Sequence, residues 1–157
     1  MTEKIFYLTK EKFEELKEEY KNLLAIEFRK TRGDVPKIFE SEDINPEYLS
    51  FQEDITFLRS RIDELQNIFK NHEIIRRPPK DKQNVVGLGA KVTVAAKGEK
   101  DELMIVGTLE ANPVSGKVSN ESPVGAALIN HKVGDEIVIS SPIKVVYKIL
   151  KINYHSS

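Results

Sequence analysis

The chain contains no cysteine among its 157 residues. This absence excludes disulfide bonds, thiolate zinc sites and cysteine nucleophiles, and it fits a reducing compartment such as the cytoplasm. No stretch approaches the roughly 18 consecutive apolar residues that a transmembrane helix needs. Residues 1–4 have no apolar run behind a basic head, so no secretory signal peptide is predicted. We therefore expect a soluble cytoplasmic protein with no membrane partner.

Net charge is also nearly absent, at −1 from 24 basic and 25 acidic residues. A balance this close to neutral argues against a protein that coats nucleic acid through bulk positive charge, although local patches of either sign remain possible. Charge of both signs is abundant, at 31% of residues against 39% hydrophobic residues. That proportion is typical of long solvated helices beside a modest core. The length favours one or two small domains.

The first half of the sequence predicts two long helices, the first over residues 10–32. This stretch is rich in Glu, Lys and Leu, which favour helix, and Thr9 is a good N-cap. Gly33 suits the left-handed position after a helix end, and Pro36 disfavours helical angles in the residue before it. The apolar stripe of this helix is expected to comprise Phe13, Leu16, Tyr20, Leu23, Leu24 and Phe28.

The second predicted helix begins where Asn45 is a favoured N-cap and Pro46 takes the first helical position, and it ends near Asn71. Its apolar residues step by three and four without a break, in the a/d pattern of a coiled coil: Tyr48, Phe51, Ile55, Leu58, Ile62, Leu65 and Phe69. Two helices of about 23 to 26 residues, each roughly 35–39 Å long, are expected to pack antiparallel. The prediction is a coiled-coil hairpin over residues 1–78 with its tip at residues 33–45. A plain coiled coil that dimerises or spaces two partners fits the heptads equally well.

The tip segment is predominantly acidic. Its carboxylates are Asp34, Glu40, Glu42 and Asp43, and its only cation is Lys37. Carboxylates at a loop apex could hold a hard divalent cation such as Mg²⁺, but one or two of them would need further ligands from another molecule. The alternative is that these acids merely favour the start of the following helix and remain solvated.

The last turns of the first helix carry a basic cluster, formed by Arg29, Lys30 and Arg32. These side chains could contact the phosphates of a nucleic acid. They could equally be solvated, as exposed cations usually are.

The second half of the sequence predicts a small β-rich domain after a polar, proline-led linker at residues 79–84. Beyond the linker the pattern changes from helical to alternating, with candidate strands at residues 85–97, 104–109, 136–140 and 143–154. Ser122 and Pro123 form an N-cap and first-turn proline for a short helix over residues 124–130. This order favours an antiparallel sheet crossed by one helix, and therefore an α+β protein.

This half carries no recognisable catalytic pattern. Gly87 and Gly89 form a lone Gly-x-Gly that leads into a strand rather than a helix, so no nucleotide site is predicted. His72, His131 and His155 lack the spacing of metal ligands. No serine lies in a recognisable catalytic motif that would pair it with a general base. We interpret the domain as a binding module.

Short motifs along the chain follow the order of a known family. Residues 8–11 and 16–19 match the opening of that family's first helix, and residues 45–48, Asn-Pro-Glu-Tyr, match its Asn-Ala-Glu-Tyr. The C-terminal match is more specific, because residues 105–107, 116–125, 127–128 and 132–136 keep the family's order and spacing. Over nearly its whole length the chain therefore resembles the bacterial Gre transcript cleavage factors and their Gre-fold relatives.

The resemblance implies a coiled coil joined to an FKBP-like domain over residues 85–157. That domain would dock at the rim of the secondary channel of a bacterial RNA polymerase through the loop containing Glu121, Ser122 and Pro123. The coiled coil would carry the tip acids to the active site, where they help hold the second Mg²⁺ for hydrolysis of backtracked RNA. The basic cluster would lie near the nascent RNA 3′ end.

On this interpretation the factor contributes residues to an active site that belongs to the polymerase. It would have no cofactor of its own, the Mg²⁺ being the polymerase's, and would not be an enzyme by itself. A monomer is expected, because the two helices can cover each other's apolar stripes.

The tip departs from the family pattern, in which an Asp and a Glu precede Asn-Ala-Glu-Tyr. Counting along the first helix puts Asp43 at the Asp, and the second acid has no clean match. Glu42 or Glu40 could substitute, whereas Asp34 fits only with an insertion of seven residues. We predict that Asp43 and Glu42 contact a metal shared with the polymerase, with Glu40 and Asp34 as further candidates.

Ile38 and Phe39 make the tip partly apolar, which is unusual for a loop that grips a metal. Three hypotheses therefore stand. The chain stimulates RNA cleavage with a rearranged acid pair, or it occupies the channel and inhibits or modulates the polymerase without cleavage. The third is a coiled-coil adaptor of another class with no polymerase partner.

Overall fold

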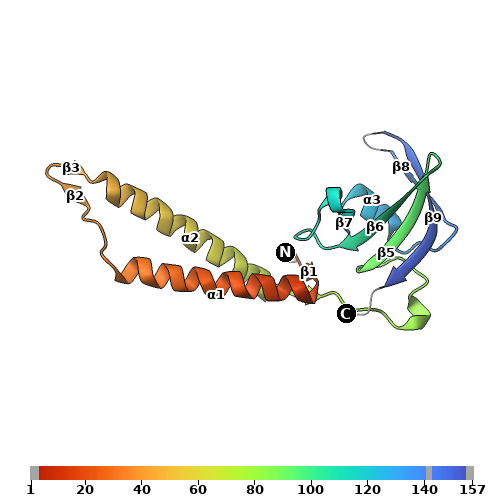
Figure 1. Cartoon of the computed structure of the whole chain (residues 1–157), viewed down its shortest axis with the longest axis horizontal. Coiled ribbons are helices and arrows are strands. Elements are labelled where there is room, and N and C mark those ends of the chain that lie inside the picture. Colours follow the sequence, from red (N-terminus) through yellow and green to blue (C-terminus); the bar gives the residue numbers. More distant parts are fainter. Residues whose placement is uncertain (1–3, 141–142, 155–157) are drawn as a thin grey trace. The chain divides into compact units, whose positions relative to one another are not determined.

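The computed structural model describes residues 4–140 and 143–154, which leaves His155 outside the described residues. The chain divides into two compact units. We call residues 13–71 the helical unit, and residues 4–12 together with 72–154 the C-terminal unit. The elements are β1 (Phe6–Leu8), α1 (Lys10–Arg32), β2 (Phe39–Glu40), β3 (Asp43–Ile44), α2 (Pro46–Lys70), β4 (His72–Ile74), η1 (Lys80–Lys82), β5 (Ala90–Ala96), β6 (Glu99–Val106), η2 (Pro113–Ser115), β7 (Lys117–Ser119), α3 (Pro123–Leu128), β8 (Glu136–Ile139) and β9 (Val145–Tyr154) (Figure 1).

Both long helices begin and end where the sequence predicts. The Oγ of Thr9 accepts a hydrogen bond from the amide of Lys12 at 3.2 Å and caps α1. The Oδ1 of Asn45 accepts one from the amide of Glu47 at 3.1 Å and caps α2, with Pro46 in the first turn. Within the two described ranges, no helix is long and apolar enough to cross a membrane.

The helices pair antiparallel in the helical unit. Their ion pairs run in opposite order along the two sequences: Glu19 with Arg61, Glu27 with Arg59, and Lys30 with Asp54. The predicted seam of α2 is buried over its central and C-terminal turns, at Ile55, Leu58, Ile62, Leu65 and additionally Ile68. At the base, the Phe69 ring meets Phe13 and Tyr20 edge-on, with centroids 5.9 and 5.5 Å away.

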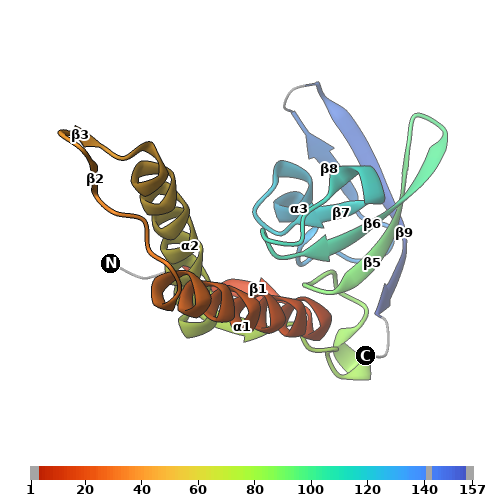
Figure 2. The ribbon, with the colours of Figure 1, turned by 60° about the vertical axis from the view of Figure 1, so that its left-hand side comes forward.

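Toward the tip, α1 and α2 diverge, as Figures 1 and 2 both show. Leu24 and Phe28 are exposed there, Phe28 to 57%. The prediction that these two residues widen the buried stripe of α1 is therefore wrong, because α2 no longer covers that part of the helix. The helical unit is packed at its base and open at its tip.

The C-terminal unit is built on a five-stranded sheet in the order β7-β6-β5-β9-β8. Strand β5 pairs antiparallel with β6 and β9, and β8 pairs antiparallel with β9, but β7 runs parallel to β6. The sheet is therefore mixed, and the expectation of a purely antiparallel sheet is wrong at this edge. Its core comprises Val86, Ala90, Val92, Val94, Ile105, Leu128, Ile137, Ile139 and Ile149.

The starts of β5 and β6 differ from the prediction for local reasons. Strand β5 begins at Ala90 rather than residue 85, because Gly89 has a φ of 87° and ends a turn before the ladder starts. Strand β6 begins at Glu99, because Lys97 and Gly98 both have positive φ and form a two-residue hairpin loop.

A short parallel pair, β1 with β4, was not predicted. It places the residues before α1 and after α2 in the C-terminal unit, so that unit begins at residue 72 where the sequence suggested a boundary at 78. Gly107 is required at this pair, because a Cβ there would lie 2.0 Å from the carbonyl oxygen of Tyr7.

Candidate functional site: an acidic hairpin at the tip

The tip folds as a miniature β hairpin formed by β2 and β3, which the sequence did not predict. Phe39 lies opposite Ile44, and Glu40 lies opposite Asp43. The hairpin is closed at its base by Asn45, whose amide donates to the carbonyl of Ile38 at 2.9 Å. The Asn45 side chain also donates to the carbonyl of Lys37 at 3.0 Å. Asn45 thus links the cap of α2 to the register of the hairpin.

The two-residue loop of this hairpin consists of Ser41 and Glu42. Ser41 has a φ of 62°, in the left-handed region that glycine adopts more easily than other residues. Hairpin loops of this length usually contain glycine or asparagine, and these residues are the sequence signal that predicts them. Because the loop has neither, the sequence carried no signal that could have revealed it.

The hairpin has two chemically different faces. Residues directly opposite each other share a face, so Glu40 and Asp43 lie on one side and Phe39 and Ile44 on the other. Their Cβ atoms are expected about 4.5–5.5 Å apart, which lets two carboxylates reach one cation. Phe39 and Ile44 are 60% and 51% exposed. The tip therefore offers a pair of carboxylates on one face, which we call the acid pair, and an apolar surface on the other.

The remaining predicted acids lie elsewhere in the tip. Glu42 is exposed in the hairpin loop, and Asp34 is exposed just after α1. The structure pairs Asp43 with Glu40, whereas the sequence-based prediction favoured Glu42 as the partner. Among the described residues, no group of three or more His, Asp or Glu side chains could hold a metal ion. To bind a metal ion, Glu40 and Asp43 would need further ligands from another molecule.

The basic cluster is partly committed to contacts within the helical unit. The Nζ of Lys30 lies 3.2 Å from the Oδ2 of Asp54. The Arg32 guanidinium stacks over the Phe28 ring at 4.6 Å from its centroid. Arg29 is exposed. Arg32 is also exposed, whereas Lys30 is half-buried.

The loop of Glu121, Ser122 and Pro123, which the family resemblance predicts to dock at a polymerase and which we therefore call the docking loop, is shaped by the start of α3. The Ser122 Oγ accepts from the amide of Gly125 at 3.1 Å and donates to the carbonyl of Ser119 at 2.7 Å. Glu121 is an exposed acid, 3.2 Å from the Nζ of Lys4. Ser122 therefore holds the loop, while Glu121 is its accessible charged group.

Comparison with known proteins agrees with this architecture. The family model "Transcription elongation factor, N-terminal" matches residues 6–74, and "Transcription elongation factor, GreA/GreB, C-term" matches residues 80–154. The chain belongs to the GreA/GreB family of transcription elongation factors. The resemblance seen in its short motifs is confirmed.

Relatives in this family cover most of the chain. Transcription elongation factor GreA of Thermomicrobium roseum is 35% identical over 137 residues, which is 86% of this chain and 88% of the relative. GreA of Clostridium acetobutylicum is 39% identical over 155 residues, covering 97% and 89%. The chain also matches a crystal structure of GreA factor homolog 1 (Gfh1) of Thermus thermophilus at 25% identity, covering 96% and 99%, with a TM-score of 0.42.

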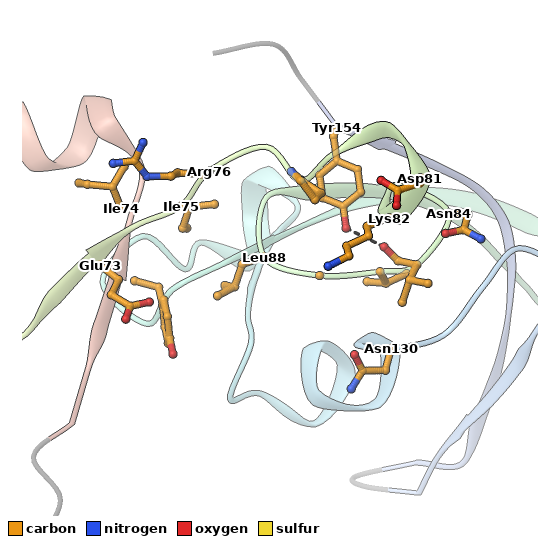
Figure 3. Close-up of a pocket in the computed structure, with 15 residues that line it drawn as sticks. Glu73, Ile74, Ile75, Arg76, Asp81, Lys82, Asn84, Leu88, Asn130 and Tyr154 are labelled. Atoms are coloured by element: carbon orange, nitrogen blue, oxygen red, sulfur yellow. Dashed lines mark hydrogen bonds between the residues drawn. The ribbon is translucent and has the colours of Figure 1, made fainter.

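This GreA/GreB family member also has a pocket in its C-terminal unit, of about 560 Å³, which the sequence did not reveal (Figure 3). It is lined by Tyr7, the segment after β4, residues 84–88, Asn130 and Tyr154. The Tyr154 hydroxyl donates to the carbonyl of Val85 at 2.6 Å, and burial raises the pKa of Tyr154. The lining residues, all of them described, include no serine, cysteine or histidine.

Proposed function

We propose that this elongation factor stimulates the RNA polymerase's own hydrolysis of backtracked RNA, and that the acid pair Glu40 and Asp43 is the group that acts. The observation that carries the proposal is their position directly opposite each other at the apex of the hairpin. Membership of the GreA/GreB family supplies the partner, a bacterial RNA polymerase. Action on bacterial transcription implies a cytoplasmic location.

The chemistry of the acid pair fits a shared Mg²⁺ ion. Mg²⁺ prefers oxygen ligands and is commonly bound through one or two carboxylates, with water and phosphate oxygens completing its shell. When bound, Mg²⁺ supplies Lewis-acid activation of water and stabilises the leaving oxygen. Glu40 and Asp43 would provide carboxylate ligands and accept a hydrogen bond from the attacking water, which orients it. The polymerase and the RNA would provide the other ligands, so the chain needs no cofactor of its own and is not an enzyme alone.

Two further surfaces complete the proposal. Arg29, with Lys30 and Arg32 beside it, would contact phosphates near the nascent RNA 3′ end. The docking loop would contact the polymerase through Glu121, since Ser122 is committed to capping α3. The factor would act as a monomer, because α2 buries its seam within the helical unit.

The deciding experiment uses a stalled, backtracked elongation complex with Mg²⁺. Addition of the protein should release short 3′ RNA fragments. Slower nucleotide addition without fragments would instead establish a regulator that occupies the channel, and failure to bind any bacterial polymerase would leave only the adaptor hypothesis. Glu121→Ala should weaken polymerase binding, whereas Glu136→Ala, an exposed acid on β8, should not.

A further inference from the structure

The segment that follows β4 concentrates positive charge. Residues 76–82 read Arg-Arg-Pro-Pro-Lys-Asp-Lys, with four cations and one acid in seven positions. The four cations, which we call the linker cations, are all exposed: Arg76, Arg77, Lys80 and Lys82. None of them forms an ion pair with any residue that the structure describes. Since the whole chain has a net charge of −1, the linker cations form a local positive patch that attracts an anion.

Two of the linker cations, Arg76 and Lys82, line the pocket of the C-terminal unit. Its volume of about 560 Å³ lies within the range of about 300–1,000 Å³ that is usual for small-ligand sites. All of its lining residues belong to the C-terminal unit. Figure 3 shows Arg76 at one end of the pocket and Lys82 at the other, with Ile75 and Leu88 between them. The pocket is therefore an apolar hollow with a cation at each end.

The middle of the pocket offers an apolar and aromatic surface. Ile75, Leu88 and Tyr154 line it and are half-buried. The Tyr154 ring is held in place, because its hydroxyl donates to the carbonyl of Val85 at 2.6 Å. An aromatic ring beside exposed cations is the combination by which proteins bind nucleotides, since the ring stacks on a base and the cations contact its phosphate.

Two amide side chains, Asn84 and Asn130, also line the pocket. Both residues are exposed, and neither side-chain amide forms a hydrogen bond with the part of the chain that the structure describes. The backbone amide of Asn130 donates to the carbonyl of Val86 at 2.9 Å, which holds this residue beside the pocket. Each side-chain amide presents donors and an acceptor, the groups that the edge of a nucleobase complements.

The pocket also contains two exposed acids, Glu73 and Asp81. Their carboxylates reduce the attraction of the pocket for a bare anion. They favour an anion that also carries hydrogen-bond donors, as the ribose hydroxyls and base amino groups of a nucleotide do.

We propose that this pocket binds a nucleotide, with its base beside Tyr154, the edge of the base at Asn84 and Asn130, and its phosphate on Arg76. Gly87 and Leu88 of the Gly-x-Gly motif line the pocket but lead into a strand. Side-chain cations therefore hold the phosphate, rather than backbone amides at a helix N-terminus. The same chemistry belongs to a free nucleotide and to one nucleotide of a single RNA strand. The site is separate from the acid pair and does not rest on the function proposed above.

The test is a titration of the full-length, ¹⁵N-labelled protein with guanosine 5′-diphosphate, followed by nuclear magnetic resonance. The shifted signals should be the backbone amides of Gly87 and Leu88 and the side-chain amides of Asn84 and Asn130. Guanosine alone and inorganic phosphate alone should each bind at least tenfold more weakly, because each makes only part of the contacts. Shifts with inorganic phosphate that equal those with the nucleotide would overturn the proposal, since they would show an anion site that holds no base.

Substitutions test the contribution of each end of the pocket. Arg76→Ala should raise the Kd roughly tenfold, because a charge-assisted hydrogen bond to the phosphate is lost. Asn130→Gly should raise it roughly fivefold. Glycine keeps the left-handed backbone there, since Asn130 has a φ of 71°. The matched control, Lys100→Ala, removes an exposed cation from β6 and should leave the Kd within about twofold of wild type. Equal affinities of Arg76→Ala and wild type would contradict the site.

A single-stranded RNA hexamer, followed by the same four amide signals, distinguishes the two sources of the nucleotide. Binding tenfold or more tighter than that of guanosine 5′-diphosphate, weakened by added salt and by Arg77→Ala, would identify a nucleotide of an RNA strand. Any smaller difference would identify a free nucleotide. If neither ligand shifts these signals at millimolar concentration, the proposal is wrong. It is equally wrong if an acidic peptide shifts them where both nucleotide ligands fail.

Discussion

Glu40 and Asp43 lie directly opposite each other across a hairpin whose strands are only two residues long. Two carboxylates in this position repel each other, so the hairpin by itself is less stable than its backbone pairing would make it. A cation between them removes that penalty. The facing carboxylates thus make the hairpin less stable but able to bind a cation, a combination that is common at functional sites.

Neutralising one member of the acid pair should therefore stabilise the hairpin while impairing its function. Glu40→Gln is expected to favour the hairpin by about 0.2–1 kcal/mol, because like charges no longer face each other. Nuclear magnetic resonance shifts and cross-strand contacts at Phe39 and Ile44 measure this population without Mg²⁺. The matched control is Glu42→Gln in the loop, which should change the population much less. A hairpin weakened by Glu40→Gln would contradict the pairing.

The loop residue Ser41 should respond to substitution according to its positive φ. Ser41→Gly is expected to stabilise the hairpin by about 1 kcal/mol, because glycine adopts this conformation without strain. Ser41→Val should destabilise it, since a β-branched side chain is least tolerant of positive φ. The same resonance measurement tests both. Equal populations for the two variants would show that the loop has another conformation.

The helical unit should depend on Arg61 more than on its other exposed ion pairs. Arg61 binds Glu19 through two contacts of 2.6 and 3.0 Å and Glu64 at 3.0 Å, and the Glu19 bond raises the pKa of Arg61. Arg61→Lys loses the two-pronged geometry and should lower the free energy of unfolding by about 1 kcal/mol. Thermal or urea unfolding measures the loss, with a Glu19→Gln double-mutant cycle. The matched control, Arg59→Lys, should cost less, because that pair has a single contact at 3.3 Å.

The C-terminal unit should lose a small stabilising contribution in acid. A hydrogen bond from the Lys132 amide, and then one from His131, holds the pKa of Asp135 below its ordinary value of 3.8. A carboxyl group with a lowered folded-state pKa stabilises the fold above its unfolded pKa, and this is lost as pH falls through the folded pKa. The difference in thermal stability between wild type and Asp135→Asn should therefore be present at pH 7 and shrink below about pH 4. A difference that grows in acid would contradict this assignment.

The parts of the fold that were predictable are those that carry local patterns. Asn45 and Pro46 marked the start of α2 by cap chemistry, and the unbroken heptad marked its buried face. The alternating residues of β9 predicted a strand, and the Ser122–Pro123 pair predicted the start of α3. The divergence of the helices could not be predicted, because Phe28 continues the apolar stripe of α1 whether or not α2 covers it.

The acid pair could not be predicted because it depends on strand register. A slip of one residue in the hairpin would place Phe39 or Ser41, rather than Glu40, opposite Asp43, and the loop has no glycine to fix the register. Strand β7 and the β1–β4 pair are three residues long, too short for a periodic pattern. The contact of Thr9 with Glu110 joins residues 101 positions apart and has no local signature.

The proposed role of the acid pair is tested most directly by the rate at which backtracked elongation complexes release 3′ RNA fragments with Asp43→Asn compared with Glu42→Gln. Asp43→Asn should lower the rate by roughly 10- to 100-fold at saturating protein, with polymerase binding retained, because one of the two carboxylates proposed to hold Mg²⁺ is lost. Glu42→Gln should stay within about twofold of wild type. A rate that survives Asp43→Asn and collapses with Glu42→Gln would contradict the assignment of the acid pair.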